Sequence, residues 1–177
     1  RVHDDVRGTK HVSSVIDVIR EKRRLNIKPK ILSTGFLALD QKLNGGFYSK
    51  QLAIIGARTA VGKTTMMQDI ALRAARNGKK CLFISLEVDA ERVVFKFLSN
   101  IASIASWKIG KNILKPHEAQ TVERAEKTLS DSGLFINDST GMTAKDIERL
   151  IKNKITEEPV DAVFIDYVQH ITYENQN

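Results

Sequence analysis

Cysteine, proline and long apolar runs are scarce in this 177-residue chain, and each scarcity excludes a class of protein. The single cysteine, Cys81, excludes an internal disulfide and a cysteine-rich zinc site. Three prolines and ten glycines are too few for a collagen-like or low-complexity disordered chain. No apolar run reaches the roughly 18 residues of a membrane span, and RVHDDVRGTK carries charge where a signal peptide needs apolar residues. We therefore expect a cytoplasmic protein with no membrane partner.

The remaining composition is that of one globular unit. A chain of this length buries close to two-thirds of its surface on folding, and 42% hydrophobic with 28% charged residues suits an α/β or α protein. Cys81 lies in the apolar run CLFIS, so we expect a small buried core residue rather than a reactive thiol.

Positive charge is concentrated at the beginning of the chain. The sequence has 28 Lys and Arg against 21 Asp and Glu, a net charge of +7, and residues 1–30 hold nine of the cations against four of the acids. A basic surface permits a polyanionic partner such as nucleic acid, but a basic run is also typical of a solvated helix face. Residues 1–30 contain no Phe, Tyr or Trp to stack on bases, which favours a subunit contact or solubility over phosphate contacts.

Two segments precede the main body. Residues 11–27 place Val12, Val15, Ile16 and Ile19 at helical spacing, which predicts an isolated amphipathic helix that ends before Pro29. Residues 33–47 read as a short capped helix closed by a pair of glycines. We interpret 1–29 as a basic linker segment and 30–177 as the core.

From residue 51 onward, apolar runs of strand length alternate with longer helical patterns. We expect strands at 52–55, 81–85, 134–136 and 162–165, and helices at 63–77, 90–104, 116–130 and 143–155. Nearly continuous apolar strands that alternate with helices predict an α/β fold, with a mainly parallel sheet covered by helices on both faces.

The stretch IIGARTAVGKTT, residues 54–65, nearly matches the phosphate-binding pattern G-x-x-x-x-G-K-[ST], with Ala57 in place of the first glycine. In such a loop, backbone N–H groups surround phosphates at a helix start, the lysine reaches the β- and γ-oxygens, and the hydroxyl faces Mg²⁺. Lys63 and Thr64 are the candidates for these two roles. The alanine is tolerable where the backbone φ is negative.

Two acidic residues follow apolar runs. Asp166 ends VDAVFID in the form of a Walker B element and would hold Mg²⁺ directly or through water, while Glu87 follows LFISL and could deprotonate an attacking water. The other interpretation of each is a solvent-facing acid after a strand.

Six motifs follow one another along the chain: TGFLALD, GGF, QLAIIGARTAVGKT, FISLE, LFINDSTGMT and FIDYVQ. In their order and at about their spacing, they resemble the motifs of the DnaB-type replicative DNA helicases, whose C-terminal ATPase domain has the RecA-like P-loop fold. In that family the loop typically has alanine in the first position. The resemblance implies ATP and Mg²⁺ as ligands, a hexamer formed through a linker helix and intersubunit ATP sites, and single-stranded DNA at a replication fork as partner. A primase and a helicase loader are further partners that the family implies.

Site residues follow from the resemblance position by position. Lys63 and Glu87 would be catalytic, Thr64 and Asp166 would hold the metal, and Gln169 would be a polar sensor of the nucleotide. The nucleotide-binding set is Ala57, Arg58, Thr59, Ala60, Val61, Gly62, Lys63, Thr64, Thr65 and Gln169. Asp138 matches a family acid whose role the sequence does not show.

Three features depart from the family pattern. Thr59 stands where the family usually has proline, and His170 where it usually has an aliphatic residue. His170 can be interpreted as a packing residue, or as a residue that contacts DNA or transfers a proton. The chain also stops soon after FIDYVQ, before the family's DNA-contacting loops and arginine finger. Two alternatives therefore stay open: a RecA-like or KaiC-like ATPase without unwinding activity, and a helicase-derived module that binds ATP and a helicase subunit.

Overall fold

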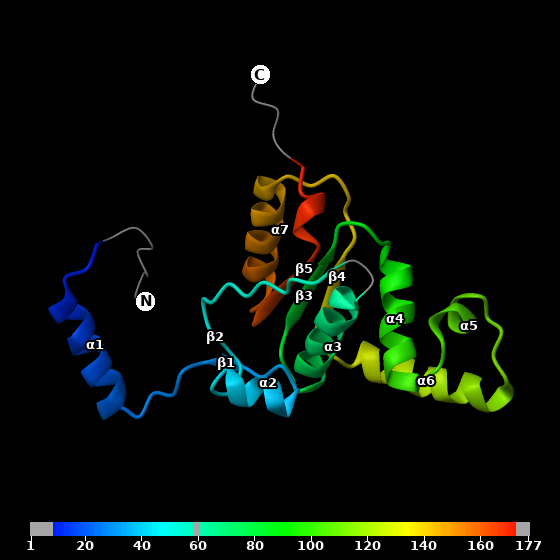
Figure 1. Ribbon diagram of the computed structural model, residues 1–177, viewed down its shortest axis with the longest axis horizontal. Coiled ribbons are helices and arrows are strands. Elements are labelled where there is room, and N and C mark those ends of the chain that lie inside the picture. Colours follow the sequence, from blue (N-terminus) through cyan, green and yellow to red (C-terminus); the bar gives the residue numbers. More distant parts are fainter. Residues whose placement is uncertain (1–8, 59–60, 173–177) are drawn as a thin grey trace, which may run out of the picture.

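The computed structural model describes residues 9–58 and 61–172, and Figure 1 shows a central sheet with helices packed around it. In chain order the elements are α1 (Val12–Arg24), β1 (Ile31–Leu32), α2 (Leu37–Lys42), β2 (Phe47–Tyr48), α3 (Lys63–Arg76), β3 (Cys81–Ser85), α4 (Ala90–Ala102), α5 (Ser106–Gly110), α6 (Pro116–Ser130), β4 (Leu134–Asn137), α7 (Ala144–Glu157), β5 (Ala162–Asp166) and the 3₁₀ helix η1 (Val168–His170). None of the described helices is both long and apolar enough to span a membrane.

The main sheet has the order β4-β3-β5, and both pairings are parallel. Cys81 pairs with Leu134 and Ala162, and at the other end Ser85 pairs with Asp166. All five residues of β3 are buried, as a strand covered on both faces requires. The predicted strands at 81–85, 134–136 and 162–165 are therefore confirmed, and their carboxyl ends meet at one edge.

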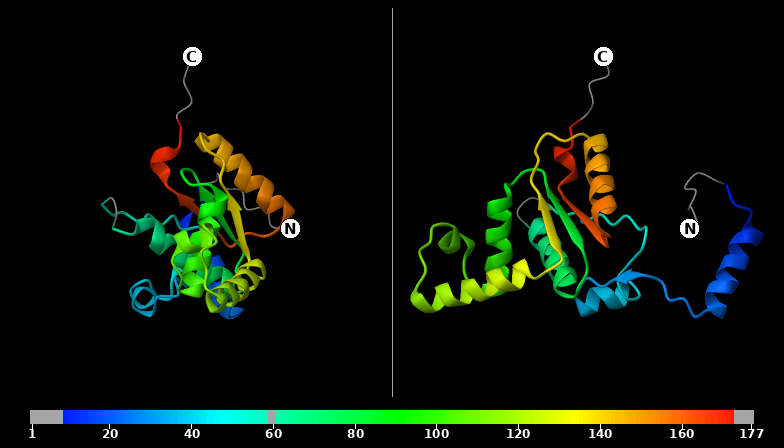
Figure 2. Two further views of the ribbon diagram at one scale, coloured as in Figure 1. Left: turned by 90° about the vertical axis from the view of Figure 1, so that its right-hand side faces the viewer. Right: turned by 180° about the vertical axis from the view of Figure 1, so that it is seen from behind.

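Helices cover both faces of this sheet, as the sequence predicts. Phe83 points to one face, where it packs with α3 and α4, including Phe97 at a ring-centroid distance of 5.7 Å. Ile84 points to the other face and packs with Ile147 of α7. Figure 2 shows α7 on the opposite side of the sheet from α3 and α4. The alternation of side chains along β3 thus divides the core into two layers.

Cys81 is fully buried against α3, as expected for a core residue. Burial, with a smaller contribution from the nearby Asp161 carboxylate, raises the pKa of the Cys81 thiol to about 12. The thiolate is the reactive form, so this cysteine is chemically inert in the folded protein.

A third apolar cluster joins α4, α5 and α6 into a lobe at one side of the molecule (Figure 1). Its buried members are Leu98, Ile109, Val122 and Ala125. The short helix α5 was not predicted, because five residues are too few to show a helical period.

The predicted strand at 52–55 is wrong. Residues 51–58 form neither helix nor strand, and the side chains of Leu52 and Ile54 are 85% and 82% exposed. An apolar run becomes a strand only where a neighbouring strand accepts its hydrogen bonds, and this run forms no ladder with any described strand. The chain therefore enters α3 from an irregular segment.

The predicted amphipathic helix at 11–27 is present as α1. Its apolar stripe is exposed, with Val12 at 68% and Ile16 at 41%, and α1 buries no residue against the described part of the chain. Figures 1 and 2 show α1 apart from the sheet, at the end of an extended connection. Its function as a linker stays a prediction.

Residues 33–47 contain the short helix α2, flanked by the antiparallel pair β1–β2, which was not predicted. The carboxylate of Asp40 organises this region. It accepts hydrogen bonds from the backbone N–H of Thr34 at 2.8 Å, from the Thr34 hydroxyl at 2.7 Å and from the Ser33 hydroxyl at 2.6 Å. Burial acts to raise the pKa of Asp40, but these bonds and one from the Gly35 backbone together hold it below its ordinary value.

We expect Asp40→Asn to reduce the free energy of unfolding by about 1.5–3 kcal/mol at pH 7, the range for hydrogen bonds to a charged group. Because the folded-state pKa is lowered, the stabilisation is complete above the unfolded-state value near 4 and is lost as the pH falls through the folded-state value. Urea unfolding from pH 7 to pH 3 should show parent and variant converging below about pH 4.

The control is Asp131→Asn at the exposed end of α6, which should change the free energy of unfolding at pH 7 by less than about 0.5 kcal/mol. A difference between parent and Asp40→Asn that stayed constant down to pH 3 would contradict this account.

Candidate functional site

The two candidate metal ligands lie in contact although they are 102 positions apart in the sequence. Thr64 is in the first turn of α3, and Asp166 is the last residue of β5. The Thr64 hydroxyl donates to Oδ1 of Asp166 at 3.1 Å, and Asp166 is only 7% exposed. A buried carboxylate requires polar or cationic partners, and this one faces the start of a helix.

These two side chains fit a magnesium ion. Mg²⁺ prefers hard oxygen ligands such as a hydroxyl and a carboxylate oxygen. Where phosphate groups supply further oxygens, one or two ligands from the protein are usual. Among the described residues, no three His, Cys, Asp or Glu side chains gather into a metal site. A cation here would therefore be held by Thr64 and Asp166 together with oxygens that do not come from the described residues.

The beginning of α3 is open to an anion. Gly62 precedes the helix with φ of 100°, a left-handed conformation that favours glycine, and nothing lies within 4 Å of the position where a Cβ would be. Its N-cap residue Gly62 has no side chain to cap the helix and the first turn has no acidic residue, whereas Asp89 caps α4 and Thr143 caps α7. The first N–H groups of α3 and its positive dipole end are left for a ligand.

Lys63 lies against the ring of Tyr167. Its Nζ atom is 4.0 Å from the ring centroid, in a cation–π contact. Such a contact stabilises an ammonium by about 0.5–2 kcal/mol, which is weaker than a charge-assisted bond to phosphate. The lysine is thus held beside the helix start and remains available to a stronger anionic partner.

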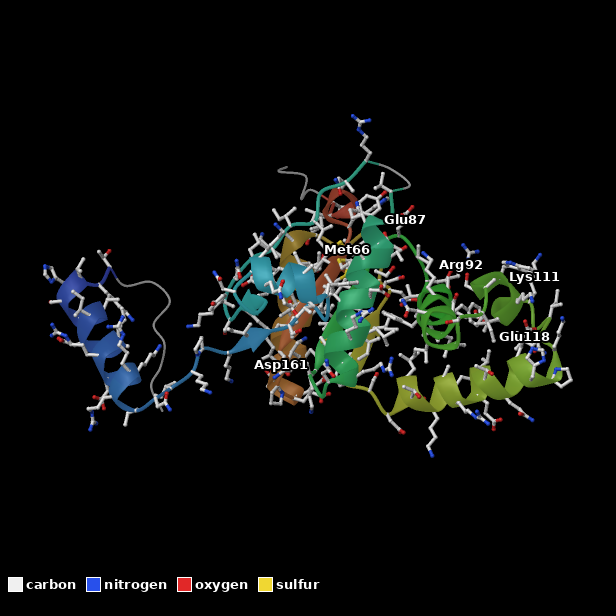
Figure 3. The ribbon with its side chains drawn as sticks, turned by 60° about the horizontal axis from the view of Figure 1, so that its bottom comes forward. Met66, Glu87, Arg92, Lys111, Glu118 and Asp161 are labelled. Carbon is white, nitrogen blue, oxygen red and sulfur yellow. The ribbon has the colours of Figure 1, made fainter. Side chains whose placement is uncertain are left out.

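Glu87 follows β3 and lies in the same group of side chains, with its carboxylate 53% exposed. Nε2 of His170 is 3.9 Å from Oε2 of Glu87, and the negative charge of Glu87 acts on the Tyr167 hydroxyl. Desolvation first, and then the negative charge of Glu87, raise the pKa of Tyr167 above its ordinary value. In Figure 3, Glu87 lies at the end of α3 that carries Met66, so its carboxylate is near the helix start.

The structure brings only some of the predicted site residues together. Lys63, Thr64, Glu87 and Asp166 form one group, connected through Tyr167. The remaining described candidates are all exposed: Ala57, Arg58, Val61, Gly62, Thr65 and, in η1, Gln169. Thr59 and Ala60 lie outside the described residues.

Two observations refine the sequence interpretation. Ala57 is not among the described non-glycine residues with positive φ, so its position requires no glycine. His170 packs its ring against the edge of Tyr167 at a centroid distance of 4.5 Å, which places it beside Glu87.

Tyr167 is the site residue that sequence reasoning missed. It stands next to Asp166 in FIDYVQ, but no pattern in the sequence shows that Lys63 lies against its ring or that its hydroxyl feels the charge of Glu87. Only the packing of β5 against the start of α3 reveals this role.

Comparison with known proteins agrees with the motif order. The chain is 32% identical over 145 residues to a probable plasmid replicative DNA helicase of Chlamydia muridarum, which covers 79% of this chain and 31% of that protein. It is 31% identical over 160 residues to the replicative DNA helicase DnaB of Helicobacter pylori, covering 89% of this chain and 33% of the relative. The chain thus spans about a third of the length of the curated relatives it matches.

Two solved structures share the fold at 20% sequence identity. One is described as the structure of a DnaB-like replicative helicase and its interactions with primase, with a TM-score of 0.79 over 97% of this chain and 42% of that one. The other is described as an ATPase domain, with a TM-score of 0.81 over 97% of this chain and 61% of that one. This likeness identifies the fold as that of RecA-like DnaB ATPase domains.

The family model of the DnaB-like helicase C-terminal domain matches residues 32–177, which is most of the chain. The match begins just after the segment that carries α1 and includes every residue of the group around Thr64 and Asp166. This chain belongs to the DnaB-like helicase C-terminal domain family.

Proposed function

We propose that this chain is the ATP-binding and ATP-hydrolysing part of a hexameric replicative DNA helicase. The observation that carries the proposal is the contact between Thr64 at the start of α3 and the buried Asp166 at the end of β5. In the proposed function, this contact would join the phosphate-binding helix to the Walker B strand.

The residues at the start of α3 would bind the triphosphate. The uncapped N–H groups of the first helical turn donate to phosphate oxygens, and the helix dipole favours the anion. Lys63 would leave the Tyr167 ring for the β- and γ-phosphates, because the bond of an ammonium to phosphate is the stronger of the two interactions. Arg58 and Gln169, both exposed, would support the nucleotide from the loop and from η1.

Thr64 and Asp166 would hold Mg²⁺, directly or through water. When bound, the cation would neutralise negative charge on the β- and γ-phosphates. Asp166 would keep its carboxylate oriented through the Thr64 hydroxyl and its position at the end of a paired strand.

Glu87 would act as the general base. Its exposed carboxylate can reach a water molecule at the phosphate end of the site and accept its proton as the water attacks the γ-phosphorus. The Tyr167 hydroxyl and the His170 ring would orient the carboxylate. An arginine from a neighbouring subunit, which the family resemblance implies, would add charge stabilisation at the transition state.

We further propose that α1 docks on a neighbouring subunit of the ring. Its exposed stripe of Val12, Val15, Ile16 and Ile19 has the width of a face that packs against another protein surface. Single-stranded DNA would be the track of the assembled motor, and primase and a loader would be its partners at the fork. Such a protein would work in the cytoplasm at the nucleoid.

The family match favours this proposal over an ATPase of the RecA or KaiC type, and over a module that binds ATP without turnover. Strand displacement on a forked DNA duplex by the full-length gene product would separate these possibilities. We expect ATP-dependent displacement, and DNA-stimulated hydrolysis without displacement would favour the RecA or KaiC type.

Two substitutions should separate nucleotide binding from hydrolysis. Lys63→Ala removes a charge that contacts phosphate, so we expect at least a tenfold weaker affinity for a fluorescent ATP analogue. Glu87→Gln keeps the size of the side chain but removes the base, so we expect binding within about threefold of the parent and hydrolysis lower by about 10²–10⁴.

Lys111→Ala, at the exposed end of α5, is the charge control and should match the parent in both assays. Normal ATP turnover by both Lys63→Ala and Glu87→Gln would refute the proposed function.

The docking of α1 has its own test. Ile16→Glu and Ile19→Glu place charge on the apolar stripe, and each loses the burial of one aliphatic side chain, about 1.5–3 kcal/mol. In sedimentation velocity with ATP and Mg²⁺, we expect the apparent dissociation constant of the assembly to rise at least tenfold. Asp17→Ala, on the exposed polar side of α1, is the matched control, and an unchanged ring in both Ile variants would argue against docking.

A further inference from the structure

The turn that carries Glu87 connects the end of β3 to the start of α4 and is held by both neighbouring strands. On the β5 side, the N–H of Leu86 donates to the backbone carbonyl of Asp166 at 2.8 Å. Within the turn, the Ser85 hydroxyl accepts from the N–H of Val88 at 3.2 Å and donates to its carbonyl at 2.5 Å. The backbone on both sides of Glu87 is thereby fixed.

The β4 side of the same turn is held by Asp138. Its Oδ2 atom accepts a hydrogen bond at 2.8 Å from the backbone N–H of Ala90, the first residue of α4. The register pairs Ile84 with Asn137, so Asp138 is the first residue beyond the paired part of β4. Parallel pairing thus brings the carboxylate to the helix start.

This bond does more than complete a helix cap. Asp89 already caps α4 by accepting from the N–H of Arg92 at 2.9 Å. Asp138 follows β4 and accepts from a different N–H, that of Ala90, so this bond connects α4 to the end of β4. The bond from Leu86 to Asp166 connects the same turn to β5. Asp138 is exposed, which means that its position is not explained by core packing.

We propose that Asp138 is a positioning residue for Glu87, acting by fixing the turn through the N–H of Ala90. The inference rests on the proposed function, in which Glu87 is the general base. Because Asp138 contacts neither phosphate nor metal in this proposal, it should affect the rate of hydrolysis and not the affinity for nucleotide.

The test is a double-mutant cycle between positions 138 and 87 in the full-length gene product. Asp138→Ala should lower kcat for ATP hydrolysis by on the order of tenfold with KM within twofold, since a displacement of about 1 Å in a catalytic group has effects of this size or larger. In single-turnover hydrolysis with enzyme in excess, adding Asp138→Ala to Glu87→Gln should change the rate by less than twofold, because there is no base left to position.

Asp138→Asn retains a side-chain oxygen that can accept from Ala90, so we expect kcat within about threefold of the parent. Glu118→Ala is the matched control for stability. Glu118 likewise accepts a backbone N–H at a helix start, from Lys115 at 2.8 Å, but it lies in the α5–α6 lobe, away from Glu87 in Figure 3. The Glu118 variant should lower the melting temperature and leave kcat within twofold of the parent.

An Asp138→Ala variant with normal kcat would overturn the inference, and so would an effect of that substitution that is as large in the Glu87→Gln protein as in the parent. An Asp138→Asn variant as impaired as the alanine variant would also overturn it, because the bond to Ala90 would not be the cause. If Glu87→Gln itself hydrolyses ATP normally, the assignment of Glu87 as general base within the proposed function fails instead.

Discussion

β3 is hydrogen-bonded in parallel to β4 on one side and to β5 on the other, and the positions of Glu87, Asp138 and Asp166 depend on this register. Parallel strands direct their carboxyl ends to the same edge of a sheet. The pairings of Ile84 with Asn137 and of Ser85 with Asp166 therefore place the residues that follow each strand side by side. A slip of one residue in either ladder would turn Asp166 or the Glu87 turn to the other face.

The core makes this register rigid. β3 is buried along its whole length between α3 and α4 on one face and α7 on the other, and shifting a closely packed strand would disrupt both layers of the core. The same helices present their ends to the site. The first turn of α3 brings Lys63 and Thr64 to the edge where β5 ends with Asp166. Sheet and helix thus meet where the chemistry is proposed.

Around this edge, the polar side chains divide into two kinds of interaction. Asp166 and Thr64 are partly or largely withdrawn from water and contact each other, whereas the Glu87 side chain is half exposed and lies beside His170. A base that must accept a proton from water requires such access, while a carboxylate that holds a cation benefits from a low-dielectric surrounding. The arrangement therefore gives two acids at neighbouring strand ends two different environments.

Sequence patterns predicted most of the regular elements, since three strands with continuous apolar residues and five helices with clear periodicity are recognisable from side-chain type alone. The candidate site residues Lys63, Thr64, Glu87 and Asp166 could be proposed from the same patterns, because each lies at or close to the end of an element. The prediction failed at 52–55, where apolar composition was taken for a strand although no described strand pairs with it.

By itself, then, the sequence determined the element types, the family and the residue types of the site, because these are properties of local composition and order. Only the tertiary structure decided that Lys63 lies against the Tyr167 ring, that Asp40 holds the turn before α2, and that Asp138 bonds to the start of α4. The contacts at positions 63, 87 and 138 join residues far apart in the chain, and their geometry follows from strand register and helix packing, which no local pattern encodes.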